Sequence, residues 1–277
     1  MVGGKGIFIS FNLYIFLFNF IMSESLCFVF MCNKPYFHKF INTCEHLINN
    51  GRYKGDICLL IGDDLNNDDM LNCDFIKNNN IFVKYFPDVR FNDYFYEINS
   101  QIEAFGNRNN TKKFQWHKLH LFNIFFKKWN FIFYIDCGIT IYSDVSPMIK
   151  EASKNVLLAH SDAFPTYEWK LDHQFDKNHV LFNKLDNNFK LNLDYFQTTI
   201  MLYDTNIIEQ NTFNDLFNLC QEYPISKTNE QGIIALYFTN IKPLFRQIRT
   251  ANNDTHFYDY LPRNDRYRYI MIKGWSG

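Results

Sequence analysis

The sequence predicts an α/β fold in which a mostly parallel central sheet is flanked by helices. Short, nearly all-apolar runs alternate along the chain with segments whose apolar residues recur at helical spacing. Strands of a parallel sheet are buried on both faces and therefore read as continuous apolar runs. The composition fits a folded protein, since 47% of the 277 residues are hydrophobic and 19% are aromatic.

The first half of the chain contains four of these strands and three helices. We expect strands at residues 26–31, 57–61, 81–86 and 131–135. Helical spacing of apolar residues predicts helices at 36–49 and 114–128, and 68–78 is long enough for a short helix. The polar stretch 87–110 has no clear periodicity, so it is left unassigned.

The second half continues the alternation without an internal repeat or a flexible linker. Strands are expected at 156–159 and 196–203, and helices at 211–220 and 230–238. We therefore expect one domain over residues 23–277, preceded by an apolar leader at residues 1–22.

The leader has two readings. Residues 7–22, "IFISFNLYIFLFNFIM", are strongly apolar but slightly short for a spanning helix, and they include Asn12 and Asn19. Three residues separate this run from the first strand, which leaves no stem, so a mis-called start is one reading and a membrane anchor is the other. The seven cysteines are scattered without a CxxC pair, which favours a reducing compartment. A cytoplasmic location is expected, with membrane anchoring as the alternative.

Two functional classes are disfavoured by composition and motif. The net charge is −1, so the chain has no domain-wide positive field with which to hold nucleic acid. No strand is followed by GxGxxG or GxxxxGK[ST], which argues against the usual dinucleotide and P-loop sites.

Polar side chains follow three of the expected strands. Asn33, Asp63 and Asp136 come at the ends of the first, second and fourth apolar runs. Ligands of parallel α/β sheets bind outside the carboxyl ends of the strands. We therefore expect the functional site at this edge of the sheet, with Asp136 as its most prominent acid.

The motif order resembles glycosyltransferase family eight, the glycogenin and galactosyltransferase group. Residues 117–149, "HKLHLFNIFFKKWNFIFYIDCGITIYSDVSPMI", resemble its central block, with a Lys-Leu pair opening a helix and a strand that ends at an Asp-x-Asp motif. "FVFMCNKPY", "LLAHSD", "YFQTTIMLYDTNII", "NEQGIIALYF" and "IKGWSG" follow the family's order of the remaining motifs. The similarity spans most of residues 26–277.

This resemblance implies a single-domain glycosyltransferase A-type fold and transfer of a sugar from a nucleotide-sugar, usually a UDP-sugar, with retention of configuration. The acceptor is a glycan, a protein or a small molecule, the enzyme class is hexosyltransferase-like, and no nucleic-acid partner is implied. The alternative is a degenerate, non-catalytic relative that binds a nucleotide-sugar or a partner protein. A nucleotidyltransferase is a further alternative. Such an enzyme would need a Gly-rich, basic loop after the first strand, and "MCNKPY" is not such a loop.

The resemblance also implies a divalent cation, Mn2+ or Mg2+, at Asp136. Such hard cations take oxygen ligands from carboxylates and phosphates, and they stabilise a departing diphosphate. The motif is divergent, because Gly138 replaces its second acid and Tyr267 stands where the family has a histidine. Without a ligand, Asp136 would only end a strand, and nearby Asp144 is expected to cap the next helix.

The donor-binding residues implied by the resemblance come from several motifs. Lys118 and Lys273 match the lysines near the donor diphosphate, and Asn33 and Tyr36 match positions that hold base and ribose. Asp162 follows a strand and could bind sugar hydroxyls. The structural alternative for Lys118 is a solvated helix lysine.

The catalytic residues implied by the resemblance are Glu230 and Gln197. Glu230 matches the first acid of the family's Asp-Gln-Asp segment, which faces the reacting sugar, and Gln231 follows it as a further donor-binding residue. A carboxylate there could stabilise an oxocarbenium-like transition state. Gln197 replaces an asparagine that bonds sugar hydroxyls. The structural alternative for Glu230 is an acid favoured at a helix N-terminus.

Overall fold

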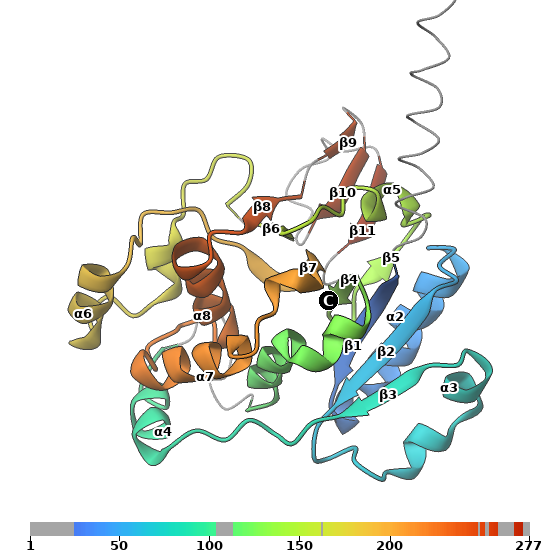
Figure 1. Cartoon of the computed structure of the whole chain (residues 1–277), viewed down its shortest axis with the longest axis horizontal. Coiled ribbons are helices and arrows are strands. Elements are labelled where there is room, and N and C mark those ends of the chain that lie inside the picture. The colour runs from blue at the N-terminus through green and yellow to red at the C-terminus, as the bar shows by residue number, and fades with distance from the viewer. Residues whose placement is uncertain are drawn as a thin grey trace, which may run out of the picture.

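A seven-stranded sheet forms the centre of the molecule (Figure 1). The computed structural model describes residues 25–103, 113–161, 163–248, 250–252, 255–259 and 269–273. The strand order is β3-β2-β1-β4-β7-β6-β8. The strands are β1 (Leu26–Cys32), β2 (Asp56–Ile61), β3 (Phe82–Tyr85), β4 (Phe131–Ile135), β6 (Leu157–His160), β7 (Gln197–Asp204) and β8 (Phe245–Gln247).

The sheet is mostly parallel, as expected. The pairs β3–β2, β2–β1, β1–β4 and β6–β8 are parallel, whereas β7 runs antiparallel to both β4 and β6. The mixed α/β architecture with a central sheet flanked by helices confirms the predicted fold class.

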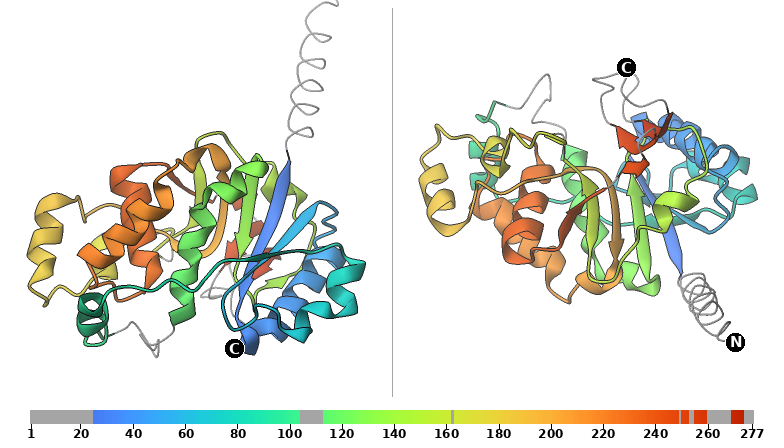
Figure 2. Two further views of the ribbon diagram at one scale, coloured as in Figure 1. Left: turned by 60° about the horizontal axis from the view of Figure 1, so that its bottom comes forward. Right: turned by 90° about the horizontal axis from the view of Figure 1, so that it is seen from above.

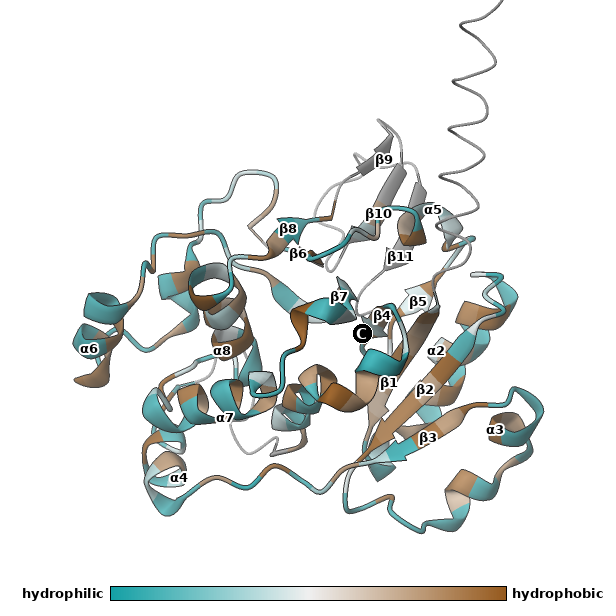
Figure 3. Ribbon diagram, in the orientation of Figure 1, coloured by the Kyte–Doolittle hydropathy of each residue, from teal (hydrophilic) through white to brown (hydrophobic). Residues whose placement is uncertain are grey.

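Burial on both faces explains the continuous apolar strands. All five residues of β4 and all eight of β7 are buried. Alternate residues enter two core clusters: Phe28 and Phe30 of β1 pack with one cluster, and Cys27, Val29 and Met31 with the other. Apolar colouring follows β1 and β2 in Figure 3.

Helices cover both faces of the sheet (Figure 2). Side chains of α2 belong to one core cluster, and side chains of α7, α8 and the segment before β4 belong to the other. The α-helices are α2 (Phe37–Asn49), α3 (Asp74–Asn78), α4 (Asp93–Asn99), α5 (Ser146–Ile149), α6 (Leu181–Asn188), α7 (Thr212–Glu222) and α8 (Glu230–Leu236). Shorter 3₁₀ turns are Lys34–Tyr36, Asp69–Asn72, Leu171–Gln174 and Thr205–Ile207, and one π-turn is Tyr237–Ile241.

The segment before β4 differs from the single helix expected at 114–128. It consists of two 3₁₀ segments, η3 (Lys113–Phe122) and η4 (Ile124–Lys128), separated at Asn123. The Asn123 side chain accepts a hydrogen bond from the Phe125 amide at 2.9 Å and so starts a new segment. Asparagine offers the backbone this local alternative to a continuous helix, which apolar spacing alone does not reveal.

The unassigned stretch 87–110 includes helix α4, which begins after Asn92. The Asn92 side chain accepts from the Phe95 amide at 2.9 Å, a standard N-terminal cap. Asp144 behaves as expected, since its carboxylate accepts from the Ser146 amide at 2.8 Å at the start of α5. Hydrogen bonding from Ser146, first from its side chain and then from its amide, holds the pKa of Asp144 below its usual value.

A second, four-stranded sheet has the order β5-β11-β10-β9 and was not anticipated from the sequence. Its strands are β5 (Thr140–Ile141), β9 (Thr250–Asn252), β10 (Thr255–Asp259) and β11 (Tyr269–Lys273). β11 is antiparallel to β5, with the Lys273 backbone opposite Thr140. The C-terminal strand thus lies beside the loop that follows Asp136.

The apolar leader, residues 1–22, lies outside the described residues, and its two readings stay as predictions. Among the helices that the structure describes, none combines the length and the hydropathy needed to cross a bilayer.

Candidate functional site

Three neighbouring parallel strands place polar residues at one edge of the sheet. The register aligns Cys32 of β1 with Ile61 of β2, so Asn33 and Asp63 emerge side by side. β4 lies on the other side of β1 in the same direction, and Asp136 follows it. The strand-end arrangement expected from the sequence is therefore present.

At this edge, one lysine contacts residues from three other segments of the chain. The Lys118 ammonium lies 3.0 Å from Asp136 Oδ1, 3.1 Å from Glu230 Oε1 and 3.3 Å from the Thr198 hydroxyl. Thr198 in turn donates to Glu230 Oε1 at 2.9 Å. We call Lys118, Asp136, Thr198 and Glu230 the lysine cluster.

Lys118 thus contacts both of the other sequence-expected residues, Asp136 and Glu230, although Glu230 lies 112 positions further along the chain. Burial differs sharply within the cluster: the side chains of Lys118 and Glu230 are 8% and 4% exposed, whereas that of Asp136 is 29% exposed. The solvated-lysine alternative for Lys118 is therefore wrong. Asp136 forms the side of the cluster that solvent can reach.

Electrostatics keep the ammonium charged. Burial by itself disfavours the cation, but the charges of Asp136 and Glu230 outweigh that cost and raise the pKa of Lys118 above its usual value. The three charged side chains carry one positive and two negative charges, a net charge of −1. Glu230 Oε2 is buried without a hydrogen-bond partner among the described residues, so this oxygen is an unused acceptor in the cluster.

Tyr134 is a further partner of Asp136. Its hydroxyl donates to Asp136 Oδ1, and its ring lies under the Lys118 ammonium at 5.6 Å. Residues two apart on a strand face the same side, so β4 itself brings Tyr134 to the acid. Burial, together with the neighbouring carboxylate, raises the pKa of Tyr134 well above its usual value, and the hydroxyl stays a donor.

A bulge in β7 brings Thr198 into the cluster. One step along β6, from Ala159 to His160, corresponds to four steps along β7, from Met201 back to Gln197. Bulges re-aim side chains relative to regular alternation and are frequent next to active sites. The hydroxyl of Thr198, inside this irregular stretch, consequently reaches the lysine.

An unusual backbone conformation precedes Glu230. Asn229 has φ 53° and ψ −128°, and its side-chain amide donates to Gln115 Oε1. Positive φ is uncommon for residues other than glycine and is held by surrounding structure when it occurs. This turn presents Glu230 as the first residue of α8, with its carboxylate towards Lys118 rather than towards solvent.

The other expected residues have varied surroundings. Asn33 and Tyr36 lie in the turn after β1, where the Tyr36 amide donates to the Asn33 carbonyl at 2.9 Å. Gln231 is buried and donates to Gln174 at 2.9 Å, within the packing beneath α8. Gln197 is buried at the start of β7. None of these contacts tests a donor-binding or catalytic role, so those roles stay predictions.

Several expected residues cannot be placed. Asp162 and Tyr267 lie outside the described residues, and only the backbone of Lys273 is described. Thr198 and Tyr134 were not predicted from the sequence. Tyr134 had a signal, its position two residues before Asp136, whereas the bulge that re-aims Thr198 has no local sequence signature.

The described residues of this site offer few ligands to a divalent cation. Asp136 supplies a carboxylate, but Tyr134 and Lys118 already engage both of its oxygens. Gly138 contributes no side chain, and the described residues contain no group of three His, Cys, Asp or Glu arranged to hold a metal ion. Mg2+ tolerates one carboxylate when phosphate oxygens and waters complete its shell. Asp136 therefore fits such a cation as a single, partly exposed ligand.

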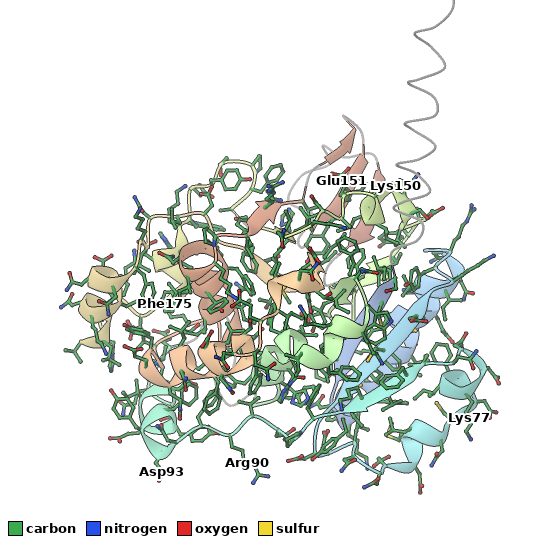
Figure 4. The ribbon with its side chains drawn as sticks, viewed as in Figure 1. Lys77, Arg90, Asp93, Lys150, Glu151 and Phe175 are labelled. Carbon is green, nitrogen blue, oxygen red and sulfur yellow. The ribbon has the colours of Figure 1, made fainter. Side chains whose placement is uncertain are left out.

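Not every acid at this edge belongs to the cluster. Asp63 accepts from the Tyr85 hydroxyl at 2.8 Å and pairs with Arg90 at 3.2 Å, and the Tyr85 bond chiefly lowers the pKa of Asp63. The Arg90 side chain is 81% exposed and points outward in Figure 4. This is a surface network with a structural role.

Comparisons with known proteins define the class of fold. No protein-family model matches the chain, and no curated protein is detectably similar in sequence. Solved glycosyltransferases, however, share the architecture. The bifunctional glycosyltransferase WbbM superposes with a TM-score of 0.56 at 14% identity, over 92% of this chain and 46% of that one. This chain thus spans less than half of the WbbM structure.

Two further structures match over most of both chains. The galactosyltransferase LgtC, solved with donor and acceptor sugar analogues, has a TM-score of 0.56 at 11% identity, covering 91% of this chain and 87% of its own. Mouse xyloside xylosyltransferase 1 has a TM-score of 0.50 at 11% identity, covering 91% and 97%. The chain has a glycosyltransferase A-like α/β fold.

Proposed function

We propose that this protein is a glycosyltransferase that moves a sugar from a nucleotide-sugar to an acceptor. The observation that carries the proposal is the lysine cluster. Its lysine and two acids come from three motifs that resemble glycosyltransferase family eight, and they meet at the carboxyl edge of the sheet. Ligands of such sheets bind at that edge. A donor of the UDP-sugar type and retention of configuration follow from the same resemblance.

Within this proposal, Lys118 positions the two acids and offers positive charge near the diphosphate. Its ammonium is held by Asp136 and Glu230, and it can exchange one of these partners for a phosphate oxygen. Asp136, as the exposed member, faces the donor. Asn33 and Tyr36 lie in the turn after β1, on the side proposed for base and ribose, and Lys273, a further proposed donor contact, belongs to β11.

Glu230 is the proposed catalytic carboxylate, with Gln197 beside the bulge. A negative charge near the anomeric carbon stabilises an oxocarbenium-like transition state. The cluster holds Glu230 Oε1 with Lys118 and Thr198, and the second oxygen, Oε2, is buried without a hydrogen-bond partner among the described residues. Asp162 and Gln231 remain proposed donor contacts.

When bound, Mn2+ or Mg2+ would supply a Lewis acid for the departing diphosphate. Asp136 is the residue that would hold it. Gly138 stands where the usual motif has its second carboxylate. The motif therefore offers the cation one carboxylate ligand, Asp136, instead of two.

Hydrolysis of a panel of nucleotide-sugars, with Mn2+ or with EDTA, tests the function. We expect turnover of at least one donor, and a loss on the order of 100-fold in Glu230→Gln. Asp215→Asn is a matched control, because Asp215 is an exposed acid on α7 that accepts from the Tyr237 hydroxyl and is not part of the lysine cluster. Absence of turnover together with absence of a thermal shift for every donor would refute the proposal.

One observation favours the second candidate, a non-catalytic relative. Both oxygens of Asp136 are engaged within the protein, and Gly138 lacks the second acid. This candidate predicts that a nucleotide-sugar shifts the melting temperature of the protein. It also predicts no turnover of that donor, either by the wild type or by Glu230→Gln. The same assay therefore separates the two functions.

A further inference from the structure

We propose that this chain docks on an anionic phospholipid surface through one side of its fold, where lysines alternate with exposed apolar side chains. These residues belong to the edge strand β3 and to the segment η4, which leads into β4. We call this set of residues the β3 surface: Phe82, Lys84, Ile124, Phe125, Lys127 and Lys128. The inference goes beyond the proposed function, because none of these residues belongs to the lysine cluster.

Charge and apolar area are held together on the β3 surface. The Lys128 ammonium lies 3.7 Å from the centroid of the Phe82 ring and 4.4 Å from that of the Phe125 ring. It also lies 4.0 Å from the Trp129 ring, and the Lys84 ammonium lies 4.7 Å from the Phe125 ring. A cation within about 6 Å of an aromatic centroid is attracted by the face of the ring. Both ammonium groups therefore stay beside the aromatic side chains.

Two large apolar side chains of the β3 surface remain open to solvent. Phe82 is 44% exposed and Ile124 is 45% exposed. Among the described strands β3 pairs only with β2, so it is an edge of the sheet (Figure 1). Lysines on an edge strand also protect it from pairing with another chain, but that role does not require exposed apolar side chains beside them. Proteins that lie on a bilayer combine the two, because apolar side chains enter the headgroup region while the lysines stay at its surface.

The β3 surface is positively charged, whereas the whole chain has a net charge of −1. Its lysines contribute three positive charges. One acid, Asp56, reaches it through the Trp129 indole, from which it accepts a hydrogen bond at 2.6 Å. The Lys127 ammonium donates to two backbone carbonyls at 3.2 and 3.0 Å, which leaves its charge in place. An anionic bilayer is therefore complementary to this surface, and each lysine close to it strengthens binding roughly 5-fold.

The strongly apolar residues 7–22 join the domain beside this surface. The Ser25 amide donates to the Asn130 side chain at 2.9 Å, and the Asn130 amide donates to the Ser25 carbonyl at 2.9 Å. Asn130 directly follows Lys128 and Trp129 in the chain. Stable attachment to a bilayer takes two signals, such as an apolar anchor together with a group of basic residues. This adjacency favours a bilayer over a protein partner as the occupant of the β3 surface.

Sedimentation of the intact chain with phospholipid vesicles tests the proposal. One vesicle type is phosphatidylcholine alone, and the other contains about 30% phosphatidylglycerol to supply the negative charge of an anionic leaflet. We expect binding to the anionic vesicles to be at least ~10-fold tighter, and to weaken when salt screens the charges. Lys84→Gln/Lys128→Gln should weaken that binding about 20-fold, from two lysines at roughly 5-fold each. Ile124→Ser should weaken it about 3-fold, because less apolar area leaves water.

Lys170→Gln/Lys184→Gln is the matched control, because it removes the same charge from partly exposed or exposed lysines outside the β3 surface. This control should bind anionic vesicles as the wild type does, and an equal loss in both double variants would overturn the proposal. Equal binding of the wild type to both vesicle types would also overturn it, and is the result expected if residues 7–22 alone hold the chain on the bilayer or if the surface binds a protein.

The wild-type comparison decides the question even if a variant fails to fold. Turnover of a nucleotide-sugar should be unchanged in Lys84→Gln/Lys128→Gln, because neither lysine belongs to the lysine cluster. Failure of the proposed function and failure of the docking proposal are therefore distinguishable.

Discussion

Replacing Lys118 with Met removes the ammonium that joins the lysine cluster and keeps a side chain of similar length. In the folded chain this leaves Glu230, 4% exposed, with the Thr198 hydroxyl as its remaining partner in the cluster. Asp136, 29% exposed, keeps its bond from Tyr134 and partial contact with water. The variant therefore isolates the energetic role of the lysine.

The magnitude follows from burial. Removing one partner of a buried ion pair costs about 3–5 kcal/mol, because a charge is left uncompensated. Glu230 meets that description, whereas solvent screens Asp136 and reduces its share. We expect Lys118→Met to lower the free energy of unfolding by about 3 kcal/mol at pH 7. That corresponds to a fall in Tm of about 6–12 °C for a domain of this size.

Urea unfolding followed by tryptophan fluorescence measures the effect, with Lys170→Met as the matched control. Lys170 pairs with Asp194 at 2.6 Å, but the two side chains are 38% and 42% exposed, so its loss should cost at most about 1 kcal/mol. In the double variant Lys118→Met/Glu230→Gln, a coupling of at least ~1 kcal/mol should appear. A cost of Lys118→Met no larger than that of the control would refute the buried cluster.

Three other measurements test further features. Burial holds the pKa of His117 at about 4 and that of His120 at about 3, so the unfolded chain binds more protons below pH 6.5. The free energy of unfolding should therefore fall between pH 6.5 and pH 4 by about 1.4 kcal/mol per pH unit for each ring, and a slope unchanged in His117→Gln would contradict this. Gly138→Asp should lower stability by about 1–2 kcal/mol because of its positive φ; an unchanged urea midpoint would show that the loop adapts. All seven cysteines are free thiols and only Cys73 is partly exposed, so a thiol reagent should react quickly with one site in native protein and with seven in guanidinium; seven fast sites in native protein would disprove this burial.

Most of the sheet could be predicted from local pattern. The apolar runs at 26–31, 57–61 and 131–135 match strands to within one residue, because a strand buried on both faces must be apolar throughout. The edge of the sheet that bears Asn33, Asp63 and Asp136 followed from strand direction. The family resemblance assigned Lys118, Asp136 and Glu230 to one site, and the structure brings both acids into contact with the lysine.

Elements without such a pattern could not be predicted. The split of 113–128 depends on one asparagine that caps a new segment, and α4 lies in a stretch without clear apolar periodicity. The second sheet depends on pairing between β5 and β11, which lie more than a hundred residues apart. Non-local pairing is decided by the packing of the whole chain, and strands as short as β5 and β11 give little local signal of it.

By itself, the sequence determined that apolar strands alternate with helices, that an acid follows the central strand, and that the second acid of the usual pair is missing. Only the tertiary structure decided what that acid does. It set Lys118 between Asp136 and Glu230, brought Tyr134 and the bulge at Thr198 against them, and turned Gly138 towards α2. Contacts between distant segments form only when the sheet and its helices pack together, and this packing leaves Asp136 as the most exposed of the three charged side chains, at 29%.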